Sequence, residues 1–179
     1  MSFSSVFKTF PALRTPRLSL RKLCASDAPA YFEALGTVDP LVWGLRAPSV
    51  EKTRTMLAGF EKGYVNKATI AWAICADDHL IGEIKLFSFI YQSKAEVAYW
   101  FSDTHRGRGY ASEALQAVTE FAFSTMNLHR VEAFAQTSNM ASIALLQRNR
   151  FADEGILRQW RREGDSWFDF KAFGRLRGD

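Results

Sequence analysis

A change of hydrophobic period across a glycine-bearing turn is the feature that most constrains this chain. Within residues 95–116, β-branched and aromatic residues at 97–101 predict a strand, and small or apolar residues spaced three and four apart after Gly109 predict a helix. Between them lie two glycines and two arginines, in residues 106–111. Glycine lets the backbone approach a ligand, and the first turn of a helix offers unpaired N–H groups and a positive dipole end. The stretch therefore predicts a cradle for an anion, most naturally a phosphate or pyrophosphate.

Two common phosphate-binding loops fit this stretch poorly. The Walker sequence ends in Gly-Lys-Ser/Thr, whereas Tyr110 and Ala111 follow Gly109. The dinucleotide fingerprint G-x-G-x-x-G would need a third glycine where Ser112 stands, which weakens that interpretation without excluding it. A plain strand-to-helix turn with two solvated arginines would also explain the residues.

The loop resembles a known family. Arg106, Gly109 and Ala111 occupy the three defined positions of R/Q-x-x-G-x-G/A, the acyl-CoA loop of the GNAT N-acetyltransferase superfamily. The longer run YWFSDTHRGRGYASEAL resembles its RimJ/RimL-like branch, and the resemblance extends over nearly the whole chain from TPRLSLRKL onward. It implies acetyl-CoA as co-substrate, and direct transfer of the acetyl group to a primary amine, either a protein N-terminal α-amine or a small-molecule amine. Acetyl-CoA and the amine acceptor are therefore the expected partners.

The resemblance also assigns site residues. Main-chain groups of the loop are expected to hold the pyrophosphate, and those of the preceding strand to pair with the pantetheine arm like an added strand. Asn139 and Ser142, one helical turn apart, match the family's N-x-x-S, in which Asn contacts the pantetheine and Ser donates to the departing thiolate. Helix capping would explain the same two residues. The expected cofactor-binding residues are Trp100, Phe101, Ser102, Arg106, Gly107, Arg108, Gly109, Tyr110, Ala111, Ser112 and Asn139, and the expected catalytic residues are Ser142 and Glu96.

The general base is the least determined assignment. Glu96 begins the strand before the loop and Glu83 lies on the preceding strand; a buried carboxylate with a raised pKa could take a proton from an incoming ammonium. A solvated residue at a strand end would also explain Glu96, and the sequence slightly favours it. His79, His105 and His129 are candidates by residue type, and water alone is a further route. Because no base is secured, a non-catalytic acyl-CoA-binding or sensor protein on the same fold remains the alternative function.

Two positions depart from the superfamily pattern. Many members carry a general-acid Tyr after the Leu of the helix that begins at N-x-x-S, but here Leu146 follows Leu145, which leaves Ser142 as the stand-in. That helix usually ends in Gly-Phe, but Arg150 precedes Phe151. A left-handed C-cap would be strained without glycine, so we expect the backbone exit to differ or Arg150 to have a particular role.

The amine acceptor is expected to contact residues 31–48, together with Phe87, Phe89 and Tyr91, while Trp43 either walls the pocket or covers the core. Nothing in the sequence selects among protein N-termini, polyamines, amino acids and antibiotics.

Composition adds a few limits. A chain of 179 residues suits one domain, residues 1–179, with a substantial core, and its net charge of +4 suits an anionic cofactor without demanding nucleic acid. Cys24 and Cys75 are far apart and form no C-x-x-C pair, so neither a metal site nor redox chemistry is indicated. We see no signal peptide and no apolar run of membrane-spanning length, so a cytoplasmic protein without membrane attachment is expected. The sequence is compatible with a homodimer and does not determine the oligomeric state.

The order of predicted elements indicates an α+β protein. Residues 1–14 are expected to form an extended arm. Strands are predicted at residues 17–23, 69–76, 80–90, 97–101, 130–136, 151–160 and 167–173, and helices at residues 26–35, 49–63, 111–126 and 139–148. By resemblance this is the GNAT fold, a central mixed, mostly antiparallel sheet of about seven strands flanked by about four helices.

Overall fold

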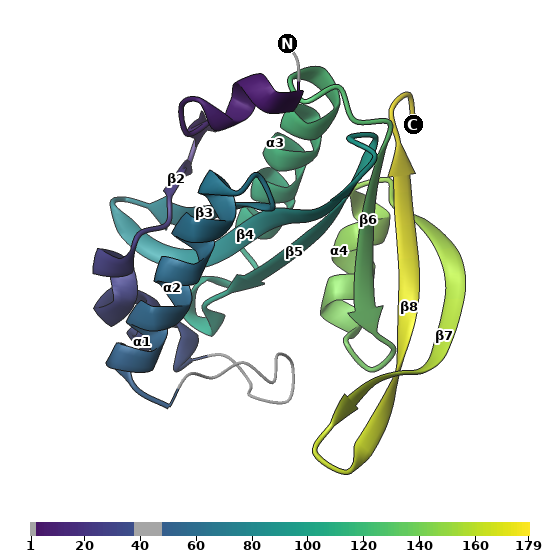
Figure 1. The fold of residues 1–179 in the computed structure, drawn as a ribbon. Helices are drawn as coiled ribbons and strands as arrows, with labels where there is room; N and C mark the ends of the chain where they lie inside the picture. Colours follow the sequence, from purple (N-terminus) through teal and green to yellow (C-terminus); the bar gives the residue numbers. More distant parts are fainter. Residues whose placement is uncertain (1–2, 38–47) are drawn as a thin grey trace.

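The computed structural model of the protein describes residues 3–37 and 48–179. Within them, the centre of the fold is an eight-stranded sheet in the order β1-β2-β3-β4-β5-β6-β8-β7 (Figure 1). Neighbouring strands are antiparallel except β5 and β6, which are parallel. The strands are β1 (Leu13–Arg14), β2 (Ser19–Lys22), β3 (Thr69–Ala76), β4 (His79–Ile90), β5 (Lys94–Phe101), β6 (Arg130–Gln136), β7 (Ala152–Glu163) and β8 (Ser166–Leu176).

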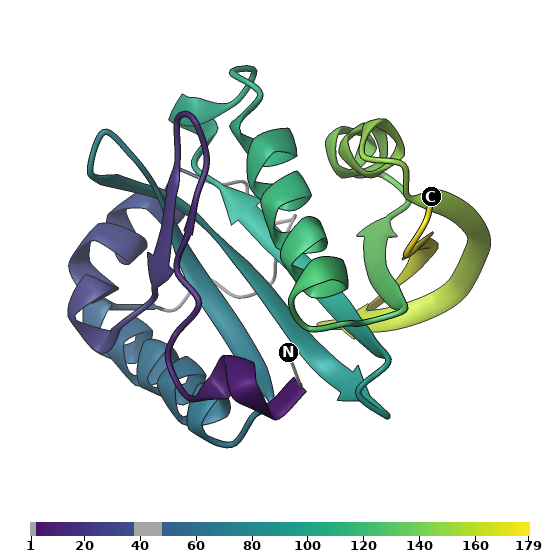
Figure 2. The ribbon, with the colours of Figure 1, turned by 90° about the horizontal axis from the view of Figure 1, so that it is seen from above.

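In the described part of the chain, four α-helices cover the two faces of the sheet: α1 (Ala28–Leu35), α2 (Val50–Val65), α3 (Tyr110–Ser124) and α4 (Met140–Arg148). Helices α1 and α2 lie on one face, and α3 and α4 on the other (Figure 2). Strand β3 shows why: Ala71 and Ala73 belong to one buried cluster with Leu57 of α2, while Ile70 and Trp72 belong to another with Leu115 of α3. The alternation of side chains along a strand thus gives the sheet a core on each face. The expected α+β architecture, a mixed and mostly antiparallel sheet flanked by helices, is confirmed.

Strands β5 and β6 separate soon after they meet. Their pairing covers residues 94–96 of β5 and residues 130–132 of β6, although both strands continue beyond these residues. Figure 1 shows the two strands diverging from this point. The edge of β5 at residues 97–101 that faces β6 therefore has no partner strand among the described residues. This separation positions the cavity described below.

The expectation of an extended arm at residues 1–14 is wrong at its start, whereas Leu13–Arg14 is extended as strand β1. Residues Phe3–Phe7 form a short 3-10 helix, and β1 follows and pairs with β2 as the strand beyond the seven predicted. The ring of Phe3 lies 5.2 Å from that of Phe89 in an edge-on arrangement, and the Tyr64 hydroxyl donates a hydrogen bond of 2.9 Å to the carbonyl of Val6. These contacts join residues far apart in the chain, so no local pattern of the arm could have shown them.

The remaining predicted elements are present with shifted ends. Strands β7 and β8 extend further than predicted, to Glu163 and Leu176, and are joined by a turn at residues 164–165. A β-bulge lies next to Gly82, because Ile74 pairs with Gly82 while Cys75 pairs with Leu80. No helix in the described part of the chain is long and apolar enough to cross a membrane.

The end of α4 keeps the left-handed cap, where we expected either a different backbone exit or a particular role for Arg150. Arg150 has φ of 62°, and the Phe151 N–H donates to the Leu146 carbonyl at 3.0 Å, a bond that closes the helix as glycine would allow. The Arg150 side chain is exposed. The backbone exit therefore does not differ, and a non-glycine residue accepts a conformation that costs about 1 kcal/mol or more.

Candidate functional site

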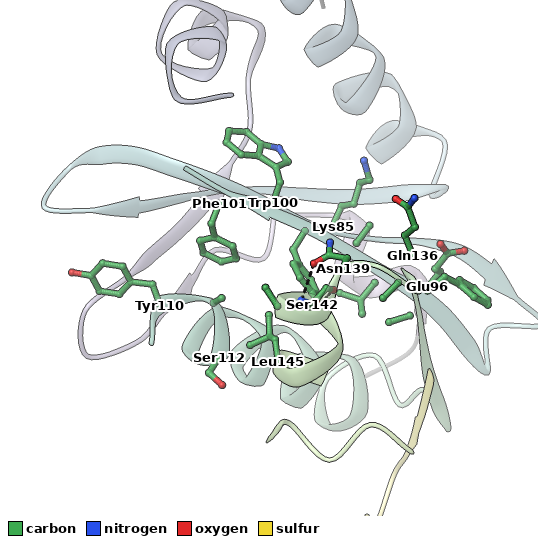
Figure 3. Close-up of a pocket in the computed structure, with 18 of the residues that line it drawn as sticks. Lys85, Glu96, Trp100, Phe101, Tyr110, Ser112, Gln136, Asn139, Ser142 and Leu145 are labelled. Carbon is green, nitrogen blue, oxygen red and sulfur yellow. Dashed lines mark hydrogen bonds between the residues drawn. The ribbon is translucent and has the colours of Figure 1, made fainter. Parts of the chain in front are cut away.

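A cavity of about 910 Å³ lies where β5 and β6 separate (Figure 3). Side-chain alternation divides its lining into two parts. On the face covered by α3 and α4, which we call the α3 half, the lining includes Val97, Tyr99, Phe101, His105, Arg106, Gly107, Gly109, Tyr110, Ala111, Ser112, Ala133, Ala135, Asn139, Ala141, Ser142, Leu145 and Arg148. On the opposite face, which we call the α2 half, it includes Phe60, Thr69, Lys85, Phe87, Glu96, Phe134, Gln136, Trp160, Arg161 and Phe170.

The turn between β5 and α3 has the conformation that an anion cradle needs. Gly107 and Gly109 adopt positive φ angles of 75° and 79°, and Gly109 is the N-cap of α3. The first bond of the helix runs from the Glu113 N–H to the Gly109 carbonyl, at 3.1 Å. The N–H groups of residues 110–112 therefore lack an acceptor within the helix, at its positive end. These residues line the cavity, so the donors and the dipole fit a diphosphate.

A residue that sequence reasoning missed holds this turn from outside. Arg17, in the turn between β1 and β2, donates from Nη1 to the Arg108 carbonyl at 2.7 Å and from Nε to the Glu113 carboxylate at 2.7 Å. Its guanidinium also lies 4.7 Å from the centre of the Tyr110 ring. Burial acts to raise the pKa of Glu113, but hydrogen bonds from Thr15 and Arg17 outweigh it and lower that pKa. We call these contacts the Arg17 clamp.

The arginines of the loop differ in position. Arg106 lines the cavity, and its guanidinium pairs with Asp103 at 2.6 Å. Arg108 is not among the lining residues, and its carbonyl is taken by the Arg17 clamp. Ser102 is buried outside the lining, and its hydroxyl is hydrogen-bonded to Thr37 at 3.0 Å. A contribution of the buried Ser102 to cofactor binding would therefore come through its main chain, whereas the Arg108 side chain is exposed beside the lining residues Gly107 and Gly109.

Other predicted cofactor residues lie as alternation requires. Trp100 and Phe101 point to opposite sides of β5 (Figure 3), and the Trp100 ring N–H donates to the Tyr31 hydroxyl at 2.9 Å. Phe101 faces the α3 half. Ser112 is a lining residue, but its hydroxyl points away from the cavity (Figure 3) and accepts a hydrogen bond of 2.8 Å from the side chain of buried Asn149. Ser112 therefore also anchors α3 to the end of α4.

Asn139, Ser142 and Tyr99 meet at the start of α4. The Asn139 side chain accepts the Ser142 N–H at 3.0 Å, so it caps the helix (Figure 3). The Ser142 hydroxyl lies 2.8 Å from the Tyr99 hydroxyl. Burial raises the pKa of Tyr99 to about 12 although its bond with Ser142 opposes the rise, so the phenol stays protonated at neutral pH. Sequence reasoning missed Tyr99. The signal that could have found it is that Tyr99 places a hydroxyl on the same side of the strand as the apolar Val97 and Phe101.

Glu96 lies in the α2 half and is partly buried. Burial raises the pKa of its carboxyl, and the neighbouring carboxylate of Glu132 raises it further. Lys85 and Arg161 act in the opposite direction without reversing the shift. A carboxyl with a raised pKa inside a cavity is a suitable proton acceptor near neutral pH.

The other candidate bases are placed less favourably. Glu83 is buried and does not line the cavity; its carboxylate accepts the Tyr31 hydroxyl at 2.5 Å and pairs with the Lys85 ammonium at 3.1 Å. His105 lines the cavity beside the loop, with its Nδ1 2.9 Å from the Thr104 hydroxyl. His79 and His129 are exposed and are not lining residues.

The aromatic residues expected around the acceptor divide into two groups. Phe87 lines the α2 half, but Phe89 packs against the N-terminal segment and Tyr91 is 94% exposed in a turn. Trp43 lies outside the described residues. The C-terminal hairpin instead supplies Trp160, whose ring stacks on that of Phe134 with centres 5.8 Å apart. This contribution could not be seen in the sequence, because it depends on how the hairpin curves over β6.

Cys24 and Cys75 are free thiols. In residues 3–37 and 48–179, no cluster of three His, Cys, Asp or Glu side chains is arranged to hold a metal ion.

Comparison with known proteins agrees with this geometry. Residues 17–152 match the model of the acetyltransferase (GNAT) domain, so the chain belongs to the GNAT family and is an N-acetyltransferase of that family. It is 32% identical over 169 residues to the uncharacterized N-acetyltransferase YoaA of Bacillus subtilis (92% of this chain, 96% of YoaA). It is 30% identical over 141 residues to the ribosomal-protein-serine acetyltransferase of Escherichia coli (76% of each).

Solved structures share the fold. A RimL ribosomal alpha-N-protein acetyltransferase in complex with coenzyme A superposes with a TM-score of 0.81 at 22% identity, over 93% of this chain and 98% of that one.

Proposed function

We propose that this protein transfers an acetyl group from acetyl-CoA directly to a primary amine while both are bound. The acceptor would be a protein N-terminal α-amine or the amine of a small molecule. The observation that carries the proposal is a single cavity with an anion cradle, a free strand edge and a hydroxyl pair in its α3 half, and a carboxyl with a raised pKa in its α2 half.

The α3 half has the features that acetyl-CoA requires. The main-chain N–H groups of residues 107–112 would hold the diphosphate, with Arg106 adding positive charge. The free edge of β5 would pair with the pantetheine arm. Acetyl-CoA supplies an acetyl group activated as a thioester. The structure of a RimL protein bound to coenzyme A shows that this fold accommodates the molecule in another protein.

Glu96 would act on the acceptor. A primary amine is mostly protonated at neutral pH, and only the neutral amine attacks. The ionised carboxylate of Glu96 would accept the proton, either directly or through water. Because burial raises its pKa, Glu96 is a stronger base than an exposed carboxylate, and the rate should rise with pH as this group ionises.

The hydroxyl pair would act on the leaving group. The Ser142 hydroxyl would donate a hydrogen bond to the departing sulfur, and the Tyr99 hydroxyl would in turn donate to Ser142. Tyr99 would thus take part of the role of the general-acid tyrosine that many superfamily members carry at the position of Leu146. Asn139 holds the first turn of α4 so that Ser142 stays in this position.

The test is to measure thiol release and the mass of the acceptor together, with acetyl-CoA and a panel of amines. One mole of thiol per mole of acetylated amine is the expected result. A thermal shift with acetyl-CoA but no thiol release with any amine would instead indicate a binding or sensor protein.

A further inference from the structure

The α2 half of the cavity carries a charge pattern that restricts the acceptor. Its walls are largely aromatic, with Phe60 and Phe87 on one side and Phe134 and Trp160 on the other. Among the described residues that line this half, the charged ones are two cations, Lys85 and Arg161, and one carboxylate, Glu96. Aromatic walls favour an apolar group, and the ions inside them are the groups that give orientation.

The two cations differ in how far they are already neutralised. The Lys85 ammonium lies 3.1 Å from a carboxylate oxygen of Glu83, which is buried, and 4.8 Å from the centre of the Phe60 ring. Its charge is therefore largely matched within the protein. Within residues 3–37 and 48–179, the ion pair of Arg161 is a long contact of 3.7 Å with Glu163, between two partly exposed side chains, and such a pair contributes little.

Arg161 is held over the cavity while its charge remains available. Its guanidinium lies 5.7 Å from the centre of the buried Phe170 ring, and the neighbouring Trp160 is fixed by stacking on Phe134. It is close enough to Glu96 to influence the ionisation of that carboxyl. A guanidinium presents a planar fork of N–H donors that matches a carboxylate or phosphate.

We infer that the acceptor is an amine that also carries an anionic group, as a free amino acid or an acidic peptide N-terminus does. Arg161 binds that group while the amine faces Glu96. This inference rests on the proposed transferase function and adds the substrate class. A polyamine would bind poorly, because its additional ammonium groups would be repelled by Lys85 and Arg161. Among the described residues that line this half, Glu96 is the single carboxylate that could balance them.

The experiment compares acceptors in pairs that differ only in the anionic group. The first pair is phenylalanine and phenylalaninamide, and the second is the amidated dipeptides Ala-Asp and Ala-Asn; spermidine is the polyamine. Each is tested with the wild type, with Arg161→Gln and with Arg162→Gln. Arg162 is a matched control, because it is the next residue of β7, pairs with Asp165 in the turn and does not line the cavity.

In the wild type, kcat/KM should be about tenfold higher for the anionic member of at least one pair, as a charge-assisted contact implies. Arg161→Gln should abolish that ratio and Arg162→Gln should preserve it. Comparing ratios between variants removes the difference in amine basicity within a pair. A preference in the first pair alone identifies a free carboxylate as the group, and one in the second pair alone identifies an acidic side chain.

Equal kcat/KM within both pairs, or spermidine as the best acceptor, would overturn the inference while leaving the transferase function intact. The same holds if Arg161→Gln lowers all rates by one common factor. Absence of acetylation with every amine would overturn the transferase function itself.

Discussion

Replacing Arg17 with methionine should weaken the use of acetyl-CoA although Arg17 lies outside the cavity lining. The substitution removes hydrogen bonds to Glu113 and to the Arg108 carbonyl, and the contact with the Tyr110 ring. Because the side chain is 48% exposed, the loss of folding stability should be only about 1 kcal/mol, or about 2–4 °C in Tm. The larger effect should be on cofactor binding, because the loop loses the contacts that fix the Arg108 carbonyl and the first turn of α3.

The assay compares acetyl-CoA with S-acetylpantetheine, which lacks the diphosphate and the adenosine. If the Arg17 clamp orients the amides that bind the diphosphate, Arg17→Met should lower kcat/KM about tenfold for acetyl-CoA and leave that for S-acetylpantetheine nearly unchanged. Arg21→Met is the control: Arg21 is 43% exposed and makes two hydrogen bonds to Asp27, of 2.7 and 2.9 Å, away from the loop. It should lose similar stability and show no donor dependence. Equal losses with both donors in Arg17→Met would refute the reasoning.

Three further predictions concern the candidate base, the hydroxyl pair and the end of α4. Glu96→Gln should flatten the rise of kcat with pH, and an unaltered pH profile would exclude this base. The same variant should raise Tm at pH 8. The reason is that a carboxyl whose folded pKa is raised stabilises the fold below its unfolded pKa and loses that contribution as pH rises through the folded pKa. Tyr99→Phe and Ser142→Ala should each lower kcat more than acetyl-CoA affinity. The loss of activation free energy in the double variant should be smaller than the sum of the two single losses, since the hydroxyls act as a pair. Strict additivity would show that the two hydroxyls act independently. Arg150→Gly should raise the free energy of unfolding by about 1 kcal/mol in denaturant titrations, since φ of 62° suits glycine; a loss of stability would show that the side chain has a structural role.

The part of the fold that could be predicted from sequence is the part whose signals are local. The change of period after Phe101, the glycines of the loop and the capping residues Ser49 and Asn139 each act over a few neighbouring residues. Ser49 does cap α2, accepting the Lys52 N–H at 3.2 Å. The order of the elements follows from such signals, and the resemblance then supplies the arrangement of the sheet.

The missed features depend on contacts between distant residues. The Arg17 clamp joins positions 96 apart, and the Tyr99–Ser142 pair joins positions 43 apart. Phe89 is of a residue type that often lines pockets, but the N-terminal 3-10 helix packs against it. Trp160 looked like the end of a strand, yet the curvature of β7 brings it over the cavity. In each case the alternation of side chains gives the face, but only the packing of a remote segment decides what that face contacts.

The central claim is that main-chain amides at the start of α3 bind a diphosphate. A crystal structure with coenzyme A, grown under conditions where calorimetry shows the protein to be saturated, tests it directly. We predict diphosphate oxygens accepting N–H groups of residues 107–112, with the pantetheine arm along the free edge of β5. Coenzyme A bound elsewhere, with these amides facing only solvent or side chains, would contradict the account.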